Sequence, residues 1–249
     1  MLKVDFRRMF TMPLLYIMMG ISVVIPVLVL VMTTMMDGST TVNPQTGMVT
    51  TMEGFKNVWQ GIGSVSGAAM SMDLTSMCNI NLTYFMLAVL VCVFVAGDFR
   101  SGYAKNLFAV RAKKGGYVMS KIVVAIASGL IMLAAYFAGT MLGGAIAGLS
   151  FDLGEVSIFG IVMCMLAKAA LIAVFAPIYV LMSVIAKQKL WMSLVGSLFG
   201  SMLLFMMIPM MTPLDSTIMH VILCIAGAAM FTVGLGAVSK TVLNKTDLV

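Results

Sequence analysis

Charged residues are scarce in this chain. Asp, Glu, Lys and Arg make up 10% of the 249 positions, whereas hydrophobic residues make up 61%. A water-soluble domain of this length cannot bury so much apolar surface, and the mean hydropathy of +1.10 is correspondingly high. The composition excludes a soluble globular protein and predicts a membrane protein.

The residue types that metal sites and catalytic centres use are also rare. There is one histidine, His220, and the four cysteines show no metal-ligand spacing. No pair of carboxylates, and no serine with a histidine partner, occurs at matching depth in the apolar runs. We expect neither an enzyme nor a bound cofactor in this chain. We expect the cysteines to be small buried hydrophobic residues; they are Cys78, Cys92, Cys164 and Cys224.

Six apolar stretches are long enough to cross a bilayer as helices, which takes about 20 residues each. The alternation that marks strands of an outer-membrane barrel is absent. We therefore expect an all-α fold in a single domain, residues 1–249, whose only long outer connection is 37–76. The predicted spans are residues 13–36, 77–97, 120–149, 157–186, 190–211 and 217–239.

Lysine and arginine are confined to alternate connections between these spans. Because such residues accumulate on the cytoplasmic side, both termini are predicted to be cytoplasmic, in the cell membrane of a bacterium. The opposite connections hold Lys56 and most of the acidic residues. The cytoplasmic set comprises Lys3, Arg7, Arg8, Arg100, Lys105, Arg111, Lys113, Lys114, Lys121, Lys187, Lys189, Lys240 and Lys245.

Residues 2–12 precede the first span and have the pattern of an amphipathic helix. Helical spacing places Leu2, Phe6 and Met9 on one face, with the basic residues, Arg8 among them, largely on the other. We expect this helix to lie along the inner membrane surface. A disordered positive tail is the alternative.

The loop between the second and third spans, residues 97–119, is strongly basic. Asp98 directly follows an apolar run, Ser101 and Gly102 permit a sharp turn, and helical periodicity then resumes. We expect a short helix here that Gly115 and Gly116 end. Attraction to anionic lipid alone, at about 1 kcal/mol per basic residue, is the simpler explanation of the charge.

Residues 98–106, DFRSGYAKN, resemble a pattern of the type-2 permeases of ATP-binding-cassette exporters. In that family the pattern is acidic, aromatic, any, Ser, Gly, Thr, any, Lys, Asn; here Tyr103 replaces the threonine. The resemblance implies a coupling helix that fits a groove on a separate ATPase subunit. The residues that inherit this role are Asp98, Arg100, Ser101, Gly102, Lys105, Asn106, Phe108, Arg111, Lys113 and Lys114.

The same resemblance implies the composition of the whole complex. Two permease copies, identical or different, would enclose a path, and two ATPase copies would hold ATP and Mg. This chain has no phosphate-binding loop of its own, since residues 234–241, GLGAVSKT, lack the second glycine and end an apolar helix. The expected substrate is amphipathic or hydrophobic: a peptide, an antibiotic or a lipid. No nucleic-acid partner is expected.

Lys168 is the only charge well inside a predicted span. A lysine there costs about 3 kcal/mol on insertion scales, so it either faces the bundle interior or reaches toward the outer surface. It would contact an anionic or carbonyl-bearing substrate, or form a structural hydrogen bond. Small residues in the fifth span, including Ser197, mark a helix contact or line a conduit. A substrate path would then include Lys168, Ser197 and Met206.

Two other classes of function fit the same sequence. An ion-coupled secondary transporter would be centred on Lys168, although we detect no internal repeat. A non-transporting immunity or sensor subunit would use the basic loop to dock a regulator. Co-purification of an ATPase separates the exporter from both.

Overall fold

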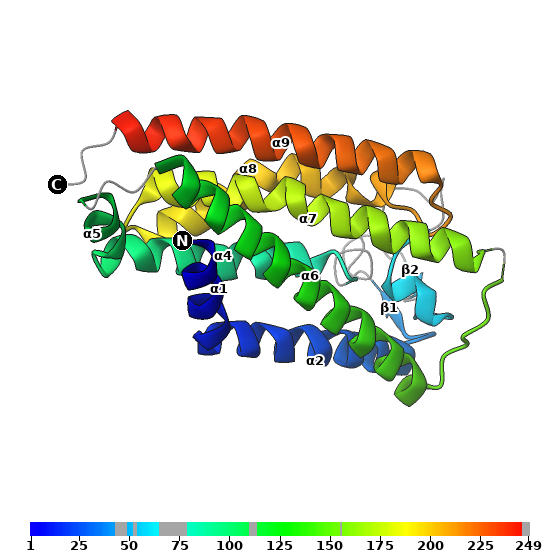
Figure 1. The fold of residues 1–249 in the computed structure, drawn as a ribbon. Coiled ribbons are helices and arrows are strands. Elements are labelled where there is room, and N and C mark those ends of the chain that lie inside the picture. Colours follow the sequence, from blue (N-terminus) through cyan, green and yellow to red (C-terminus); the bar gives the residue numbers. More distant parts are fainter. Residues whose placement is uncertain (43–48, 52–53, 65–78, 110–113, 155, 246–249) are drawn as a thin grey trace.

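The computed structural model describes residues 1–42, 49–51, 54–64, 79–109, 114–154 and 156–245 (Figure 1). Two short strands and a 3-10 helix accompany the helices: β1 (Thr40–Val42), β2 (Val49–Thr51) and η1 (Val58–Gly61). The helices are α1 (Leu2–Thr11), α2 (Pro13–Met35), α4 (Leu82–Arg100), α5 (Tyr103–Ala109), α6 (Lys114–Ala147), α7 (Ile158–Ala186), α8 (Leu190–Met211) and α9 (Ile218–Lys245).

Six of these helices, α2, α4, α6, α7, α8 and α9, are long and apolar enough to cross a membrane. The chain is therefore a multi-pass membrane protein. The predicted spans overlap all six helices, and the fifth, residues 190–211, agrees at both ends. The second, predicted at 77–97, lies at Leu82–Arg100, five residues later at its start and three at its end. The third and sixth helices extend farther than predicted, to Lys114 and Lys245 respectively, because a helix can continue into the interface beyond its apolar segment.

The bundle is arranged around α4, the most deeply buried of the six long helices. The most extensive helix pairs are α7 with α9 and α6 with α2, and α8 packs on α7 and α4. Figure 1 shows α1 and α5 at the same end of the bundle as the last turn of α9. We call this the basic end, because every described lysine and arginine except Lys56 and Lys168 lies there or in the adjoining helix turns.

Two glycines let α6 approach α2 closely. A Cβ atom on Gly139 would lie 2.5 Å from the carbonyl oxygen of Val23, and one on Gly143 would lie 2.8 Å from the Cα of Val27. Small residues at four-residue spacing commonly allow such contact between helices in lipid. The glycines of the third predicted span therefore form a packing face within the bundle.

The short helix predicted in the basic loop is present as α5, but its predicted end is wrong. Gly115 and Gly116 lie in the first turn of α6 instead of ending α5. A Cβ on Gly115 would lie 3.3 Å from the side chain of Lys240. Glycine here leaves room for α9 to pass the start of α6, so the residue serves packing and not helix termination.

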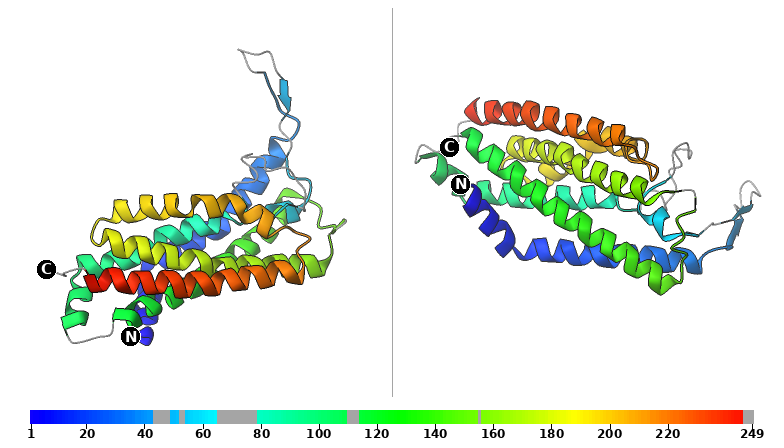
Figure 2. Two further views of the ribbon diagram at one scale, coloured as in Figure 1. Left: turned by 90° about the horizontal axis from the view of Figure 1, so that it is seen from above. Right: turned by 45° about the vertical axis from the view of Figure 1, so that its right-hand side comes forward.

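At the opposite end, β1 pairs antiparallel with β2, with Thr41 opposite Thr50. This hairpin of two three-residue strands lies outside the helical bundle and leaves the fold all-α, as expected; Figure 2 shows it projecting beyond the bundle. The nearby η1 segment packs on the connection that follows α6. There the Val58 N–H donates to the Ser150 carbonyl (3.2 Å), and the Trp59 indole donates to the Phe151 carbonyl (3.2 Å).

We predict that Gly139→Ala destabilises the bundle by about 1–3 kcal/mol, because the new methyl group overlaps the α2 backbone. The matched control is Gly234→Ala on α9, where a Cβ meets nothing within 4 Å. The free energy of unfolding in detergent micelles measures both changes. Equal stability of the two variants would contradict this account of the α2–α6 contact.

Candidate functional site

The basic loop begins where α4 ends at Arg100. The Ser101 N–H donates to the Gly97 carbonyl (2.9 Å), which closes the helix. Gly102 then has φ +72°, a left-handed conformation that favours glycine, and α5 starts at the next residue. The Ser-Gly pair therefore forms the turn that the sequence predicted and separates α5 from α4.

Four of the predicted loop residues, Arg100, Ser101, Lys105 and Asn106, are exposed. Phe108 is half-buried, with its ring 5.3 Å from the Tyr117 ring of α6 in an edge-to-face contact.

Lys114 is engaged within the chain, because its ammonium donates to the Leu243 carbonyl at the end of α9 (2.7 Å). Arg111 and Lys113 lie outside the described residues.

Asp98 is fully buried directly beneath this loop. Its carboxylate lies 2.6 Å from the Arg8 guanidinium of α1 and 2.6 Å from the Lys121 ammonium of α6. The Tyr117 hydroxyl donates to the same carboxylate (3.0 Å). Asp98 therefore joins three helices and is a partner of internal groups, not an exposed docking residue.

Asp5 completes the arrangement from α1. Its carboxylate lies 2.8 Å from the Lys121 ammonium and accepts a hydrogen bond from the Ser120 hydroxyl at 2.5 Å. It also lies 3.9 Å from the Arg8 guanidinium. We call Asp5, Arg8, Asp98 and Lys121 the four-charge cluster.

The four-charge cluster is electrically neutral, with two carboxylates facing two cations. The side chains of Asp5, Asp98 and Lys121 are wholly buried, and that of Arg8 is 33% exposed. Burial disfavours the charged form of Arg8, but the hydrogen bond and charge of Asp98 outweigh it and raise the pKa of Arg8 above its usual value. The guanidinium therefore stays charged at any physiological pH.

Aromatic rings enclose the two cations. The Lys121 ammonium lies 3.9 Å from the centre of the Phe94 ring, and the Arg8 guanidinium lies 4.1 Å from the centre of the Tyr103 ring of α5. Such contacts favour a cation by about 0.5–2 kcal/mol, most when water is excluded. The rings thus help to compensate for the loss of hydration.

The structure corrects the predicted position of Arg8 on α1. The helix is present, but Asp5 and Met9 form its buried face and Arg8 points toward Asp98, while Leu2 is 43% exposed. An apolar–polar division of α1 missed this, because a buried carboxylate without a cationic partner would cost several kcal/mol and Arg8 supplies that partner.

The sequence did contain one signal for the cluster. Asp5 and Asp98 are the two acidic residues at the basic end within the described part of the chain, and both belong to the cluster. In this chain, both described acidic residues on the lysine-rich side therefore belong to an internal ion pair.

Lys168 faces the bundle interior, one of the two orientations that the sequence allowed. It is fully buried, and its ammonium donates to the Asn81 amide oxygen (2.7 Å) and to the Thr212 hydroxyl (3.0 Å). Asn81 precedes α4 and Thr212 follows α8. The lysine thus ties α7 to the ends of two neighbouring helices, on the side away from the basic end.

The structure does not bring Ser197 and Met206 together with Lys168. Ser197 is buried, with its hydroxyl 3.2 Å from the Cys92 sulfur. It precedes Thr212 by 15 residues on α8, a helical rise of about 22 Å. Met206 is half-buried between these levels. The small residues of α8 pack against α4 and α7. They therefore form a helix contact, which was one of the two predictions made for them from the sequence.

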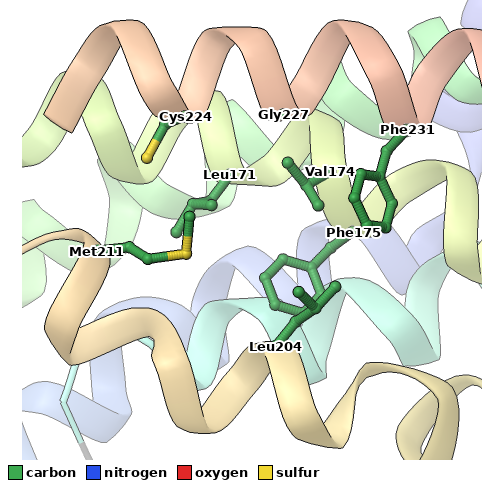
Figure 3. A pocket seen from close by; sticks show the side chains of 8 residues that line it. All are labelled: Leu171, Val174, Phe175, Leu204, Met211, Cys224, Gly227 and Phe231. Atoms are coloured by element: carbon green, nitrogen blue, oxygen red, sulfur yellow. The ribbon is translucent and has the colours of Figure 1, made fainter. Parts of the chain in front are cut away.

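A cavity of about 60 Å³ lies between α7, α8 and α9 (Figure 3). It is too small for a peptide or an antibiotic and contains no charged group. Its lining consists of Leu171, Val174, Phe175, Leu204, Met211, Cys224, Gly227 and Phe231. This cavity therefore cannot hold such a substrate.

The described cysteines, Cys92, Cys164 and Cys224, are buried and free, as expected. Cys78 lies outside the described residues. No group of histidine, cysteine or acidic residues that could hold a metal ion occurs among the residues that the structure describes.

Comparisons with known proteins identify no relative: no family model, no curated protein and no solved structure matches this chain.

We predict that Lys121→Met lowers the free energy of unfolding by about 3–5 kcal/mol, because it leaves a buried carboxylate without its partner. Adding Asp5→Asn restores neutrality, with Arg8 and Asp98 remaining as a pair. The double variant should therefore be more stable than Lys121→Met alone. Additive losses in this double-mutant cycle would show that the charges do not act together.

Lys168→Met should cost about 1–3 kcal/mol, because it leaves the buried amide oxygen of Asn81 without this donor. If the lysine also contacts substrate, turnover at a fixed amount of folded protein should fall as well. Thermal unfolding and substrate-dependent ATP hydrolysis measure the two effects separately. Unchanged turnover per folded molecule assigns Lys168 a structural role alone.

Proposed function

We propose that this chain is the permease subunit of an ATP-binding-cassette exporter and that α5 is its contact with a separate ATPase subunit. In this proposal the basic end faces the cytoplasm, in accordance with the preference of lysine and arginine for that side. The resemblance of residues 98–106 to the type-2 permeases motivates the proposal. A single structural observation carries it: α5 is exposed at its tip and fixed at its base.

The exposed side of α5 suits a protein contact. Arg100, Lys105 and Asn106 point to solvent around a helix of only two turns. A partner that receives this surface must supply negative or polar groups, because opposite charges guide association and select the partner. ATP hydrolysed on that partner would drive transport, so this chain needs no nucleotide site.

The base of α5 suits the transmission of force. The Phe108 ring contacts Tyr117 of α6, and the chain enters α5 two residues after the end of α4. Tyr117 in turn donates to Asp98 of the four-charge cluster. A rigid connection of this kind passes a displacement to the membrane helices, whereas a flexible loop would absorb it.

The burial of Lys168 and Ser197 supports a path between two permease copies. Lys168 and Ser197 are buried among side chains of their own bundle, and the cavity of about 60 Å³ cannot hold an amphipathic substrate. Two bundles side by side would provide a lipid-accessible interface for a hydrophobic peptide, antibiotic or lipid. The second copy can be identical or different.

The test is co-purification of an ATPase with the chain from its native membrane. We predict that Arg100→Glu combined with Lys105→Glu lowers the amount of ATPase recovered by about tenfold, equivalent to roughly 1.4 kcal/mol of binding free energy. The two introduced glutamate side chains should repel the negative groups of the partner that contact α5.

The matched control reverses two other exposed charges at the basic end, Lys240→Glu with Lys245→Glu on α9. This variant should retain the ATPase. An unreversed chain that purifies with no ATPase would refute the exporter proposal, and equal losses in both variants would refute the specific role of α5.

A further inference from the structure

We infer that α1 and α5 form one mechanical unit and that Arg8 and Tyr103 are the residues that join them. The inference concerns a contact between the two short helices at the basic end, which are separated in sequence by two membrane spans. That this unit transmits force rests on the proposed function, whereas the contact itself is independent of it.

Arg8 binds two elements at once. One guanidinium nitrogen lies 2.6 Å from the Asp98 carboxylate at the end of α4, and the guanidinium carbon lies 4.1 Å from the centre of the Tyr103 ring on α5. The guanidinium is planar and stays charged, so it can stack on a ring while it donates to a carboxylate. A lysine would supply the charge without the planar stacking.

Tyr103 is the position at which this chain departs from the permease pattern, which has threonine there. A threonine has no ring and could not form this contact. The ring also lies 5.9 Å from the Lys121 ammonium, so both cations of the four-charge cluster face it. The Tyr103 ring therefore provides the contact from α5 to α1.

The joint between α1 and α2 is short, so α1 is coupled closely to the membrane span α2. Met12 is the single residue between the two helices, and Pro13 begins α2 with a fixed φ angle. The Tyr16 hydroxyl of α2 donates to the Phe10 carbonyl of α1 across the joint (2.8 Å). A displacement of α1 therefore reaches α2 directly.

These contacts define a second route from α5 into the bundle. The first runs through α4 and α6, which flank α5 in sequence. The second runs from Tyr103 through Arg8 to α1 and on to α2, which packs on α6 at Gly139 and Gly143. Movement of α5 would thus shift the outer helix α2 together with the central helices.

The experiment measures the distance between α1 and α5 by pulsed electron paramagnetic resonance. Spin labels replace Lys3 and Asn106, both exposed, in a full chain whose four cysteines are changed to alanine. We expect a narrow distance distribution for this parent. Tyr103→Leu should at least double its width, and Tyr103→Phe, which keeps the ring, should leave it unchanged.

An equally narrow distribution in Tyr103→Leu would overturn the inference, and so would equal broadening in Tyr103→Phe. Arg8→Leu removes the other partner of the same contact. It should broaden the distance distribution as Tyr103→Leu does. Thermal unfolding of each labelled chain verifies that the bundle is folded during the measurement.

A second measurement separates this inference from the proposed function. With the ATPase that co-purifies, Tyr103→Leu should retain binding of the subunit and lose at least half of the transport-linked ATP hydrolysis, whereas Tyr103→Phe should keep both. Full hydrolysis in Tyr103→Leu would overturn the second route. Absence of any ATPase with the parent chain would refute the exporter proposal and leave the distance result standing.

Discussion

Neutralisation of buried charge is the constraint on which the basic end depends. Two carboxylates and two cations lie together at the membrane boundary, where an unpaired charge would cost several kcal/mol. Each carboxylate contacts Lys121, and a hydroxyl from α6 donates to each one. The positions of α1, α4 and α6 are thereby fixed relative to one another, and the exposed surface of α5 acquires a defined orientation because Phe108 and Tyr103 contact this same group of residues.

The charges also explain why so little hydrophobic specificity is needed at this end. Met9 and Leu15 are buried in a cluster with Leu90 and Phe94, and methionine and leucine side chains of this kind can pack in several arrangements. Ion pairs at 2.6–2.8 Å permit one arrangement. In this respect the polar contacts specify the position of α1, whereas the apolar contacts supply much of its affinity for the bundle.

Much of the fold could be predicted from the sequence, because a helix in lipid must be apolar over its whole length. The bounds of the fourth and fifth spans follow from hydropathy alone, within a residue of α7 and α8. The site could be predicted only in part. The turn at Ser101 and Gly102 is a local property, but the pairing of Asp5 with Lys121 joins residues that are 116 positions apart. Periodicity contains no information on such contacts. It placed Met9 and Phe6 on the packed face of α1 correctly but did not place Arg8 against Asp98.

Lysines from other helices hold both ends of α4. Lys121 binds Asp98 in its last turn, and Lys168 binds Asn81 just before its first turn. Sliding of α4 along its own axis would separate both ammonium groups from their acceptors on this helix in the same step, leaving Lys121 with Asp5 alone and Lys168 with Thr212 alone. The contacts at its two ends therefore set the height of the central helix in the bundle relative to α6 and α7.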